Sequence, residues 1–291
     1  MLDELNIIKI AETYLKNDSN KIIKGIGDDT AVIKSFKGKQ LLTSDMLVEG
    51  THFLLDKISP YDLGWKSLAV NISDIASMSG IPSFALLSLG LNKNITYDWI
   101  KNFYKGLSDC AESYKVNVVG GDTVSSESSI VINISLIGTS DKPIYRDKVK
   151  KDFILTTTGY LGLSGLGFWL LTKQKNNYSE EEKYCITKHV KPIPRVEEGL
   201  FLGKKIIKLA MMDCSDGLYS SCKTLCEQNK LGLTLYKDNF QISDELAKHL
   251  VKSRVKCIGI DAFSPDNEPY NVHRILLKEG IPIVENLVNL D

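Results

Sequence analysis

Five short segments that contain aspartate are spread along the 291 residues of the chain, and their side chains offer oxygen ligands. Carboxylates that gather in one place repel one another, so a site built from several of them needs cations between them. Hard divalent ions such as Mg²⁺ take oxygen ligands from carboxylates, hydroxyls and phosphates. We therefore predict a magnesium site that handles a nucleotide. The segments are residues 27–29, 43–45, 71–74, 120–123 and 213–217.

The surroundings of these segments favour one shared site. Taken singly, each has an ordinary explanation: Asp28 and Asp29 suit a turn, and Asp45 suits a helix cap. Four of the five segments, however, follow a strand-like apolar run or stand beside glycine, whereas residues 71–74 fall within a helical pattern. Because ligands commonly gather where such apolar runs end, the joint pattern favours convergence over five unrelated turns and caps.

The elements that must position these segments alternate between helix and strand. Periodicity predicts helices over residues 3–15, 62–78 and 97–114. The same reasoning predicts strands over residues 30–33, 40–44, 83–91, 116–119 and 130–137, the first two joined as a hairpin across residues 37–39. Helices among strands that are partly adjacent in sequence indicate an α+β fold with a mixed or antiparallel sheet.

A second unit is expected to begin near Lys148. Its predicted strands cover residues 152–157, 209–212 and 233–236, and its predicted helices cover residues 166–172, 196–207 and 218–228. The polar stretch 173–182 is expected to be an exposed linker or lid. In both units, a strand delivers aspartate next to glycine.

Composition limits the classes of partner. Lysine plus arginine number 36, as do aspartate plus glutamate, so the chain gives no electrostatic reason to expect nucleic acid or an anionic membrane as a partner. The N-terminal residues lack the basic and apolar regions of a signal peptide. The longest apolar stretch, residues 81–91, is too short and too polar to span a bilayer. We expect a cytoplasmic protein.

Other common sites are disfavoured by spacing. No Gly-x-x-x-x-Gly-Lys-Ser/Thr sequence occurs, which excludes a P-loop. The glycines of residues 159–167 miss the dinucleotide spacing, and they fit a phosphate-binding turn or a tight strand-to-helix connection. Cys222 and Cys226 share a helix face without nearby histidines, so we expect reduced thiols and no zinc site. His52 suits the core or a substrate-facing position equally.

Five longer strings of the chain resemble the thiamine-monophosphate kinase family. They are residues 25–33, 43–53, 64–78, 120–123 and 213–218, and the resemblance runs from about residue 3 to about residue 249. That family belongs to the fold superfamily of aminoimidazole ribonucleotide synthetase. The resemblance implies an α+β fold with an ATP- and magnesium-binding, dimerising domain (residues 1–147) and an incomplete substrate-side domain (residues 148–250). It further implies a homodimer whose N-terminal sheets pair to bind ATP.

The resemblance also implies a role for individual residues. His52 would face thiamine monophosphate. Side chains that would hold several Mg²⁺ ions are Asp29, Thr43, Ser44, Asp45, Asp74, Asp122, Asp213 and Asp216. Residues that would contact the nucleotide are Tyr104, Gly121, Asp122, Arg146 and Ser215. The guanidinium of Arg146 suits this role because its fork can bind phosphate oxygens at two points.

The implied reaction is a direct in-line transfer of the γ-phosphoryl group of ATP to thiamine monophosphate, giving thiamine diphosphate. Charge repulsion between the two phosphates is the main obstacle, and metal ions that neutralise and align them supply most of the catalysis. The acceptor phosphate is already ionised near neutral pH, since its second pKa is about 6. No catalytic general base is therefore assigned.

Beyond residue 246 the chain departs from the family. A Gly-Gly-Glu-Asp-Tyr-Glu segment and a C-terminal portion that closes over the thiamine are absent. The predicted third segment, residues 251–291, instead resembles the tail of the metal-dependent cyclase/formamidase family. His273 and Glu285 fall where that family has a metal-site histidine and glutamate. A hydrolase site needs more ligands, so we expect a strand-helix-strand segment without hydrolytic chemistry.

Three alternatives to an active kinase stay open. The chain could be a nucleotide-binding but catalytically impaired kinase remnant, since the absent segment should form much of the thiamine pocket. It could be a metal-dependent hydrolase or cyclase acting through the tail, although the missing ligands count against this. It could also be another phosphoryl-transfer enzyme of the superfamily, although residues 47–53 favour the thiamine branch. Both a natural fusion and a sequence artefact would explain the tail.

Overall fold

The chain divides into two compact units, residues 1–221 and 222–291. The structure is a computed structural model that describes residues 4–26, 30–35, 37–173, 177–205, 208–234, 258–259, 271–278 and 283–284. Among the helices so described, none combines the length and apolar character needed to cross a bilayer. The domain boundaries predicted after residues 147 and 250 stay predictions.

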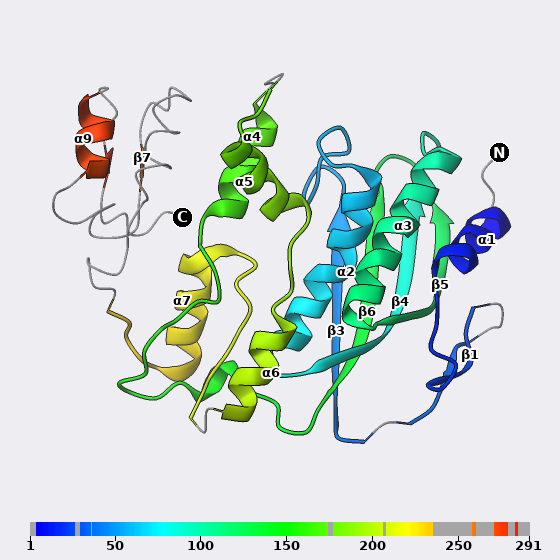
Figure 1. The fold of residues 1–291 in the computed structure, drawn as a ribbon, viewed down its shortest axis with the longest axis horizontal. Coiled ribbons are helices and arrows are strands. Elements are labelled where there is room, and N and C mark those ends of the chain that lie inside the picture. Colours follow the sequence, from blue (N-terminus) through cyan, green and yellow to red (C-terminus); the bar gives the residue numbers. More distant parts are fainter. Residues whose placement is uncertain are drawn as a thin grey trace. The chain divides into compact units, whose positions relative to one another are not determined.

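A four-stranded mixed sheet forms the centre of the first unit (Figure 1). Strand β6 (Val131–Ser140) pairs antiparallel with both β3 (Lys39–Val48) and β4 (Ile81–Leu91). Strand β5 (Asn117–Ser125) pairs parallel with β4, which gives the order β3-β6-β4-β5. Of the two forms that the sequence left open, a mixed or an antiparallel sheet, the structure has the mixed one.

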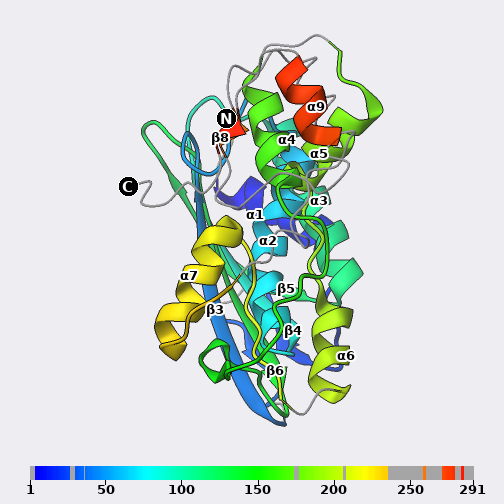
Figure 2. The same ribbon diagram turned by 90° about the vertical axis from the view of Figure 1, so that its left-hand side faces the viewer.

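Helices α2 (Pro60–Ser77) and α3 (Tyr97–Tyr114) cover one face of this sheet (Figure 2). Each starts at a capping residue: the side chains of Ser59 and Thr96 accept hydrogen bonds from backbone N–H groups of the first turn. The helix-facing side of the sheet is apolar and buried, and the core includes Leu63, Leu68, Ile72, Phe103, Ile132, Ile134 and Leu136. The opposite face of the sheet carries several exposed side chains.

Close contact between α2 and α3 depends on a missing side chain. A Cβ atom on Gly106 of α3 would lie 1.8 Å from the carbonyl oxygen of Tyr61 on α2. Helix α1 (Glu4–Tyr14) packs against α3, and α6 (Val196–Lys205) packs against α2. The α2 helix, which carries one of the aspartate segments, is therefore fixed between the sheet and its helical neighbours.

The predicted hairpin across residues 37–39 is wrong. Strand β2 (Val32–Ile33) pairs with β1 (Ile22–Lys24), whereas β3 pairs along its whole length with β6. Ten consecutive residue pairs join β3 to β6, from Lys39–Ser140 to Val48–Val131. This long register gives β3 more backbone hydrogen bonds than a short hairpin with β2 could supply.

The segment after residue 145 is largely helical, and three of its helices lie where the sequence predicts helices, over residues 166–172, 196–207 and 218–228, as far as these residues are described. It contains a short 3-10 helix (Arg146–Lys148), α4 (Leu163–Thr172), α5 (Glu180–Val190) and α7 (Gly217–Asn229). The predicted strands 152–157 and 209–212 are wrong, because neither segment pairs with any described strand. Residues 233–234 of the predicted strand 233–236 are not in a strand either, and the rest lies outside the described residues.

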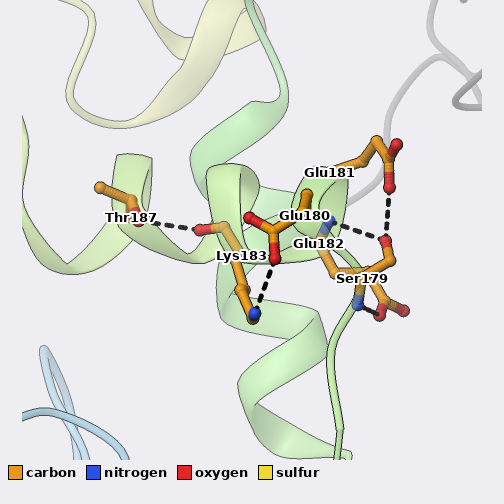
Figure 3. Close-up of polar contacts among 6 residues, drawn as sticks. All are labelled: Ser179, Glu180, Glu181, Glu182, Lys183 and Thr187. Atoms are coloured by element: carbon orange, nitrogen blue, oxygen red, sulfur yellow. Dashed lines mark hydrogen bonds and ion pairs between the residues drawn. The ribbon is translucent and has the colours of Figure 1, made fainter.

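Helix α5 begins inside the stretch predicted to be a linker. The side chain of Ser179 accepts a hydrogen bond from the backbone N–H of Glu182, and the Glu182 carboxylate accepts one from the backbone N–H of Ser179 (Figure 3). This reciprocal pair is a capping box. An ion pair of 2.7 Å between Lys183 and Glu180 further stabilises the first turn of α5. Local polar contacts thus start a helix that apolar periodicity does not reveal.

The second unit contains the strand-helix-strand segment expected from the sequence. Strand β7 (Ile258–Gly259) pairs parallel with β8 (Ile283–Val284), and α9 (Asn271–Lys278) lies between them in sequence. His273 belongs to α9, and Glu285 lies outside the described residues. The resemblance of this tail to a cyclase stays a prediction.

Candidate functional site

Strand β3 and helix α2 bring two of the aspartate segments together. Successive side chains of a strand point to opposite faces, so Thr43 and Asp45 both face α2. The hydroxyl of Thr43 donates a hydrogen bond to the Asp74 carboxylate. The backbone N–H of Asp45 donates to Oδ1 of Asn71 over 3.1 Å. Asn71 and Asp74 lie three residues apart on α2, so one helix face fixes both contacts.

A third aspartate segment lies within electrostatic reach of the first two. Burial raises the pKa of Asp45, and the Asp74 and Asp216 carboxylates raise it further, while His52 opposes them. Burial also raises the pKa of Asp213 to about 6, with added repulsion from Asp74, Asp45 and Asp216. The four carboxylates, called the carboxylate cluster below, therefore converge although they are far apart in sequence.

The donor atoms of the carboxylate cluster fit magnesium. They are hard oxygens, and their mutual repulsion favours a bound cation. Within the described part of the chain, no three Asp, Glu, His or Cys side chains are placed to hold a metal ion by themselves. The site therefore suits an ion that also takes oxygens from phosphate and water, as Mg²⁺ commonly does.

Lowering the pH from 7 to 5 is expected to raise the melting temperature of the metal-free protein. Because the folded-state pKa of Asp213 is raised to about 6 from 3.8, the folded state binds a proton more tightly than the unfolded state. The resulting destabilisation is fully present above pH 6 and is lost as the pH falls toward 4. Thermal unfolding in a chelator should show this rise in melting temperature on acidification in the wild type and not in Asp213→Asn. Identical pH profiles for the two proteins would contradict the placement of Asp213.

A cavity of about 910 Å³ is lined by residues of the sheet, including β3, which carries Asp45, and by residues of α1. Four residues of the predicted site line it: Thr43, Tyr104, Gly121 and Asp122. Thr43 lines the cavity and also hydrogen-bonds Asp74, so this residue joins the cavity to the carboxylate cluster. The volume is within the range of pockets that hold small ligands.

Gly121 allows β5 to approach β4 closely at the cavity. A Cβ atom at this position would lie 1.7 Å from the carbonyl oxygen of Leu87, so no other residue fits without moving a strand. Asp122 is exposed, and its Oδ1 accepts a hydrogen bond from the backbone N–H of Thr123 over 2.8 Å. Tyr104 is buried, and burial raises the pKa of its hydroxyl above the usual range.

The exposed side chain of His52 is oriented by the backbone. Its Nδ1 accepts a hydrogen bond from the backbone N–H of Val48 over 3.0 Å. A neutral imidazole has one donor and one acceptor nitrogen, so Nε2 carries the proton. His52 therefore offers an N–H group to a ligand, in the connection that follows β3, the strand that carries Asp45.

The remaining predicted residues are dispersed. Ser44 lies on the face of the sheet opposite Thr43 and Asp45, where its hydroxyl contacts Asn133 and Ser135. Arg146 and Ser215 are exposed, and Asp29 lies outside the described residues. Asn71, which holds the backbone of Asp45, has a role that the sequence did not reveal. Its spacing of three from Asp74 within a helical pattern is the only signal.

The chain is similar to known proteins along most of its length. Residues 27–140 match the family described as AIR synthase related protein, N-terminal domain. A thiamine-monophosphate kinase of Buchnera aphidicola subsp. Schizaphis graminum is 39% identical over 246 residues, which is 83% of this chain and 74% of the relative. The thiamine-monophosphate kinase of Bacillus subtilis is 38% identical over 253 residues, 85% of this chain and 77% of the relative.

A solved structure shares the fold. The protein described as AaThiL complexed with AMPPCP and TMP is 35% identical, with a TM-score of 0.61. The match covers 71% of this chain and 66% of the solved one, slightly less than two thirds. The predicted α+β fold of the aminoimidazole ribonucleotide synthetase-like superfamily is thereby confirmed.

Proposed function

Since the chain belongs to the thiamine-monophosphate kinase family, we propose that it transfers the γ-phosphoryl group of ATP to the phosphate of thiamine monophosphate. The observation that carries this proposal is the convergence of Asp45, Asp74, Asp213 and Asp216. A related chain described as complexed with AMPPCP and TMP supports ATP as the co-substrate. The products would be thiamine diphosphate and ADP.

The carboxylate cluster and the hydroxyl of Thr43 would hold Mg²⁺. When bound, this ion would neutralise and align the donor and acceptor phosphates, which supplies most of the catalysis in phosphoryl transfer. Thr43 already hydrogen-bonds Asp74, which keeps both oxygens together. Ser44 lies on the opposite face of the sheet, and Asp122 lines the cavity. Both would contact metal ions bound on the nucleotide side of the site. Asp29 completes the proposed ligand set.

The cavity lined by Tyr104, Gly121 and Asp122 would take the nucleotide. The absence of a side chain at Gly121 lets the backbone of β5 lie against Leu87 of β4, and this close approach shapes the wall of the cavity. Arg146 and Ser215 would contact the same nucleotide from outside the sheet. The Nε2–H group of His52 would donate to the thiamine monophosphate, and its orientation is fixed by the contact with Val48.

No residue needs to act as a general base in this reaction. The phosphate that attacks ATP is ionised near neutral pH, because its second pKa is about 6. The residues of the site therefore bind, orient and neutralise. His52 is a donor and cannot remove a proton from the acceptor while Nε2 is protonated.

We further propose a homodimer formed through the open face of the sheet. Leu42 and Met46 on β3 are 73% and 53% exposed, and Leu86 and Val124 add to the same face. Large exposed apolar patches mark interaction sites. A second copy of this face would bury these side chains beside the nucleotide cavity, because Leu42 and Leu86 also line that cavity.

Replacing Leu42 and Met46 together by Lys is expected to convert the dimer to a monomer in sedimentation experiments, because like charges then meet at the interface. The matched control is Phe201→Lys, which alters an exposed apolar side chain on α6. The control should sediment as the wild type does. A wild-type protein that sediments as a monomer would refute the proposed dimer.

The proposed activity is tested by incubating the protein with ATP, Mg²⁺ and thiamine monophosphate and separating the thiamine compounds by chromatography. Magnesium-dependent formation of thiamine diphosphate is expected. Binding of ATP without product would instead indicate a kinase remnant. Failure to bind ATP and to form product would refute the proposal.

A further inference from the structure

Lys66 is a buried cation that the proposed site does not use. It lies on α2, and only 8% of its surface is exposed. Among the described residues, no ion pair joins it to a carboxylate, and burial lowers the pKa of its ammonium group to about 8. A buried ammonium group without a counter-charge costs stability, whereas an apolar side chain at this position would not. This cost points to a specific role for the Lys66 nitrogen.

Two acceptors lie within reach of the Lys66 nitrogen, and they come from different elements. The backbone carbonyl oxygen of His52, in the connection between β3 and α2, is 3.5 Å away. Nε2 of His189, near the end of α5, is 3.4 Å away. Lys66 thus links the connection that holds the proposed substrate-binding histidine to a helix of the following segment.

The chemistry of His189 fixes the direction of these contacts. Burial and the Lys66 charge lower the pKa of His189 to about 4, so this imidazole is neutral at neutral pH. An ammonium group can only donate, so Nε2 accepts from Lys66 and Nδ1 carries the proton. Nδ1 then donates to the hydroxyl of Ser164 over 3.1 Å. The chain from Lys66 through His189 to Ser164 is therefore a directed set of hydrogen bonds.

Both ends of His52 are constrained by this arrangement. The side-chain Nδ1 accepts a hydrogen bond from Val48, and the backbone carbonyl accepts one from Lys66. Together the two contacts determine where the Nε2–H group of His52 points. The Val48 contact alone sets the ring relative to its own turn, whereas the Lys66 contact sets that turn relative to α2 and the carboxylate cluster.

We propose that Lys66 is a positioning residue for the acceptor substrate: it ties the backbone of His52 to α2 and α5 and so holds the His52 imidazole against the bound acceptor phosphate. This inference rests on the proposed function. Lys66 acts through His52, without touching the reacting atoms. Its loss should weaken the use of thiamine monophosphate more than the use of ATP, because the nucleotide cavity is lined by other residues.

The fold does not depend on Lys66 to keep α5 and the segment after it in place. Nε1 of Trp65 donates a hydrogen bond to the carbonyl oxygen of Pro192 over 2.8 Å. The Lys191 nitrogen lies 4.3 Å from the centre of the Trp65 ring. The hydroxyl of Tyr114 also donates to the carbonyl oxygen of Pro194. A Lys66 variant is thus expected to remain folded.

The test compares Lys66→Met with Lys191→Met. Both remove an ammonium group from the same interface, but Lys191 contacts aromatic rings and neither histidine. Lys66→Met is expected to raise the KM for thiamine monophosphate about tenfold and to leave the KM for ATP within about twofold. Lys191→Met should change neither constant. Equal effects on both substrates, or no effect on thiamine monophosphate, would overturn the inference.

A second measurement does not depend on activity. In Lys66→Met, the pKa of His189 should rise, because the Lys66 charge lowers it in addition to the effect of burial. Nitrogen-15 NMR can follow this titration, with a His189→Gln protein to assign the signal. An unchanged His189 titration would show that Lys66 does not contact His189. Failure of the kinase assay in the wild type would refute the proposed function and leave this result standing.

Discussion

Asparagine in place of Asp45 is expected to lower kcat/KM for thiamine diphosphate formation by about 10³-fold or more. That loss corresponds to about 4 kcal/mol, within the several kcal/mol that a metal ion contributes to a charged transition state. The same substitution should raise the melting temperature in the absence of metal. Asp45 is partly buried beside other carboxylates that raise its pKa, so its charge destabilises the empty site. Steady-state kinetics and thermal unfolding in a chelator would measure both effects.

A matched control separates this effect from a general effect of removing charge. Glu127 is an exposed carboxylate in the connection between β5 and β6. Glu127→Gln should leave kcat/KM and the metal-free melting temperature close to the wild type. An Asp45→Asn protein that keeps wild-type turnover would refute the assignment of Asp45 as a metal ligand. A lower metal-free melting temperature would argue that Asp45 is a structural residue.

Alanine in place of Gly121 is expected to destabilise the protein by about 3 kcal/mol or more and to abolish ATP binding. The new Cβ atom would lie 1.7 Å from the carbonyl oxygen of Leu87, so β5 would have to move away from β4. Overpacking that forces a backbone shift produces losses of this size. The movement would also displace Asp122 and the wall of the nucleotide cavity. Chemical denaturation and calorimetric titration with ATP would measure the two effects.

Gly165→Ala is the control for this substitution. Gly165 lies in α4, where a Cβ atom would meet nothing within 4 Å. Alanine there should stabilise the helix by about 0.5–1 kcal/mol, since glycine is the weaker helix former. ATP binding by a stable Gly121→Ala protein would contradict the proposed nucleotide site.

The first half of the fold could be predicted in most of its elements. Helix α3 occupies the predicted residues 97–114, because Thr96 is a clear capping residue before an amphipathic pattern. The pairing of β3 could not be predicted from local sequence. Its partner β6 lies more than eighty residues further on, as in the pair Lys39–Ser140, and only the folded sheet shows which strands are neighbours.

The second half shows why an apolar run does not guarantee a strand. Residues 152–157 were predicted as a strand, yet Ile154 is 87% exposed and the segment pairs with no described strand. A strand needs a neighbour to satisfy its backbone N–H and C=O groups. Helix α5, by contrast, was hidden in a polar stretch, because its start depends on the capping box at Ser179.

The grouping of four aspartates could be predicted from residue type, whereas their role as metal ligands stays a prediction. Aspartates stand out in a sequence, and Asp45, Asp74, Asp213 and Asp216 indeed converge. Strand alternation could have placed Ser44 on the face opposite Asp45. The contact of Lys66 with His189 could not have been predicted, since 123 residues separate two side chains that belong to no shared motif.

Binding of Mn²⁺, used as a spectroscopic substitute for Mg²⁺, tests the central claim most directly. Electron paramagnetic resonance would count the ions bound in the presence of AMPPCP, for the wild type and for a protein with both Asp45→Asn and Asp213→Asn. The convergence of the carboxylates predicts that the double variant binds fewer ions than the wild type. Equal numbers bound with equal affinity would contradict a shared metal site at this cluster.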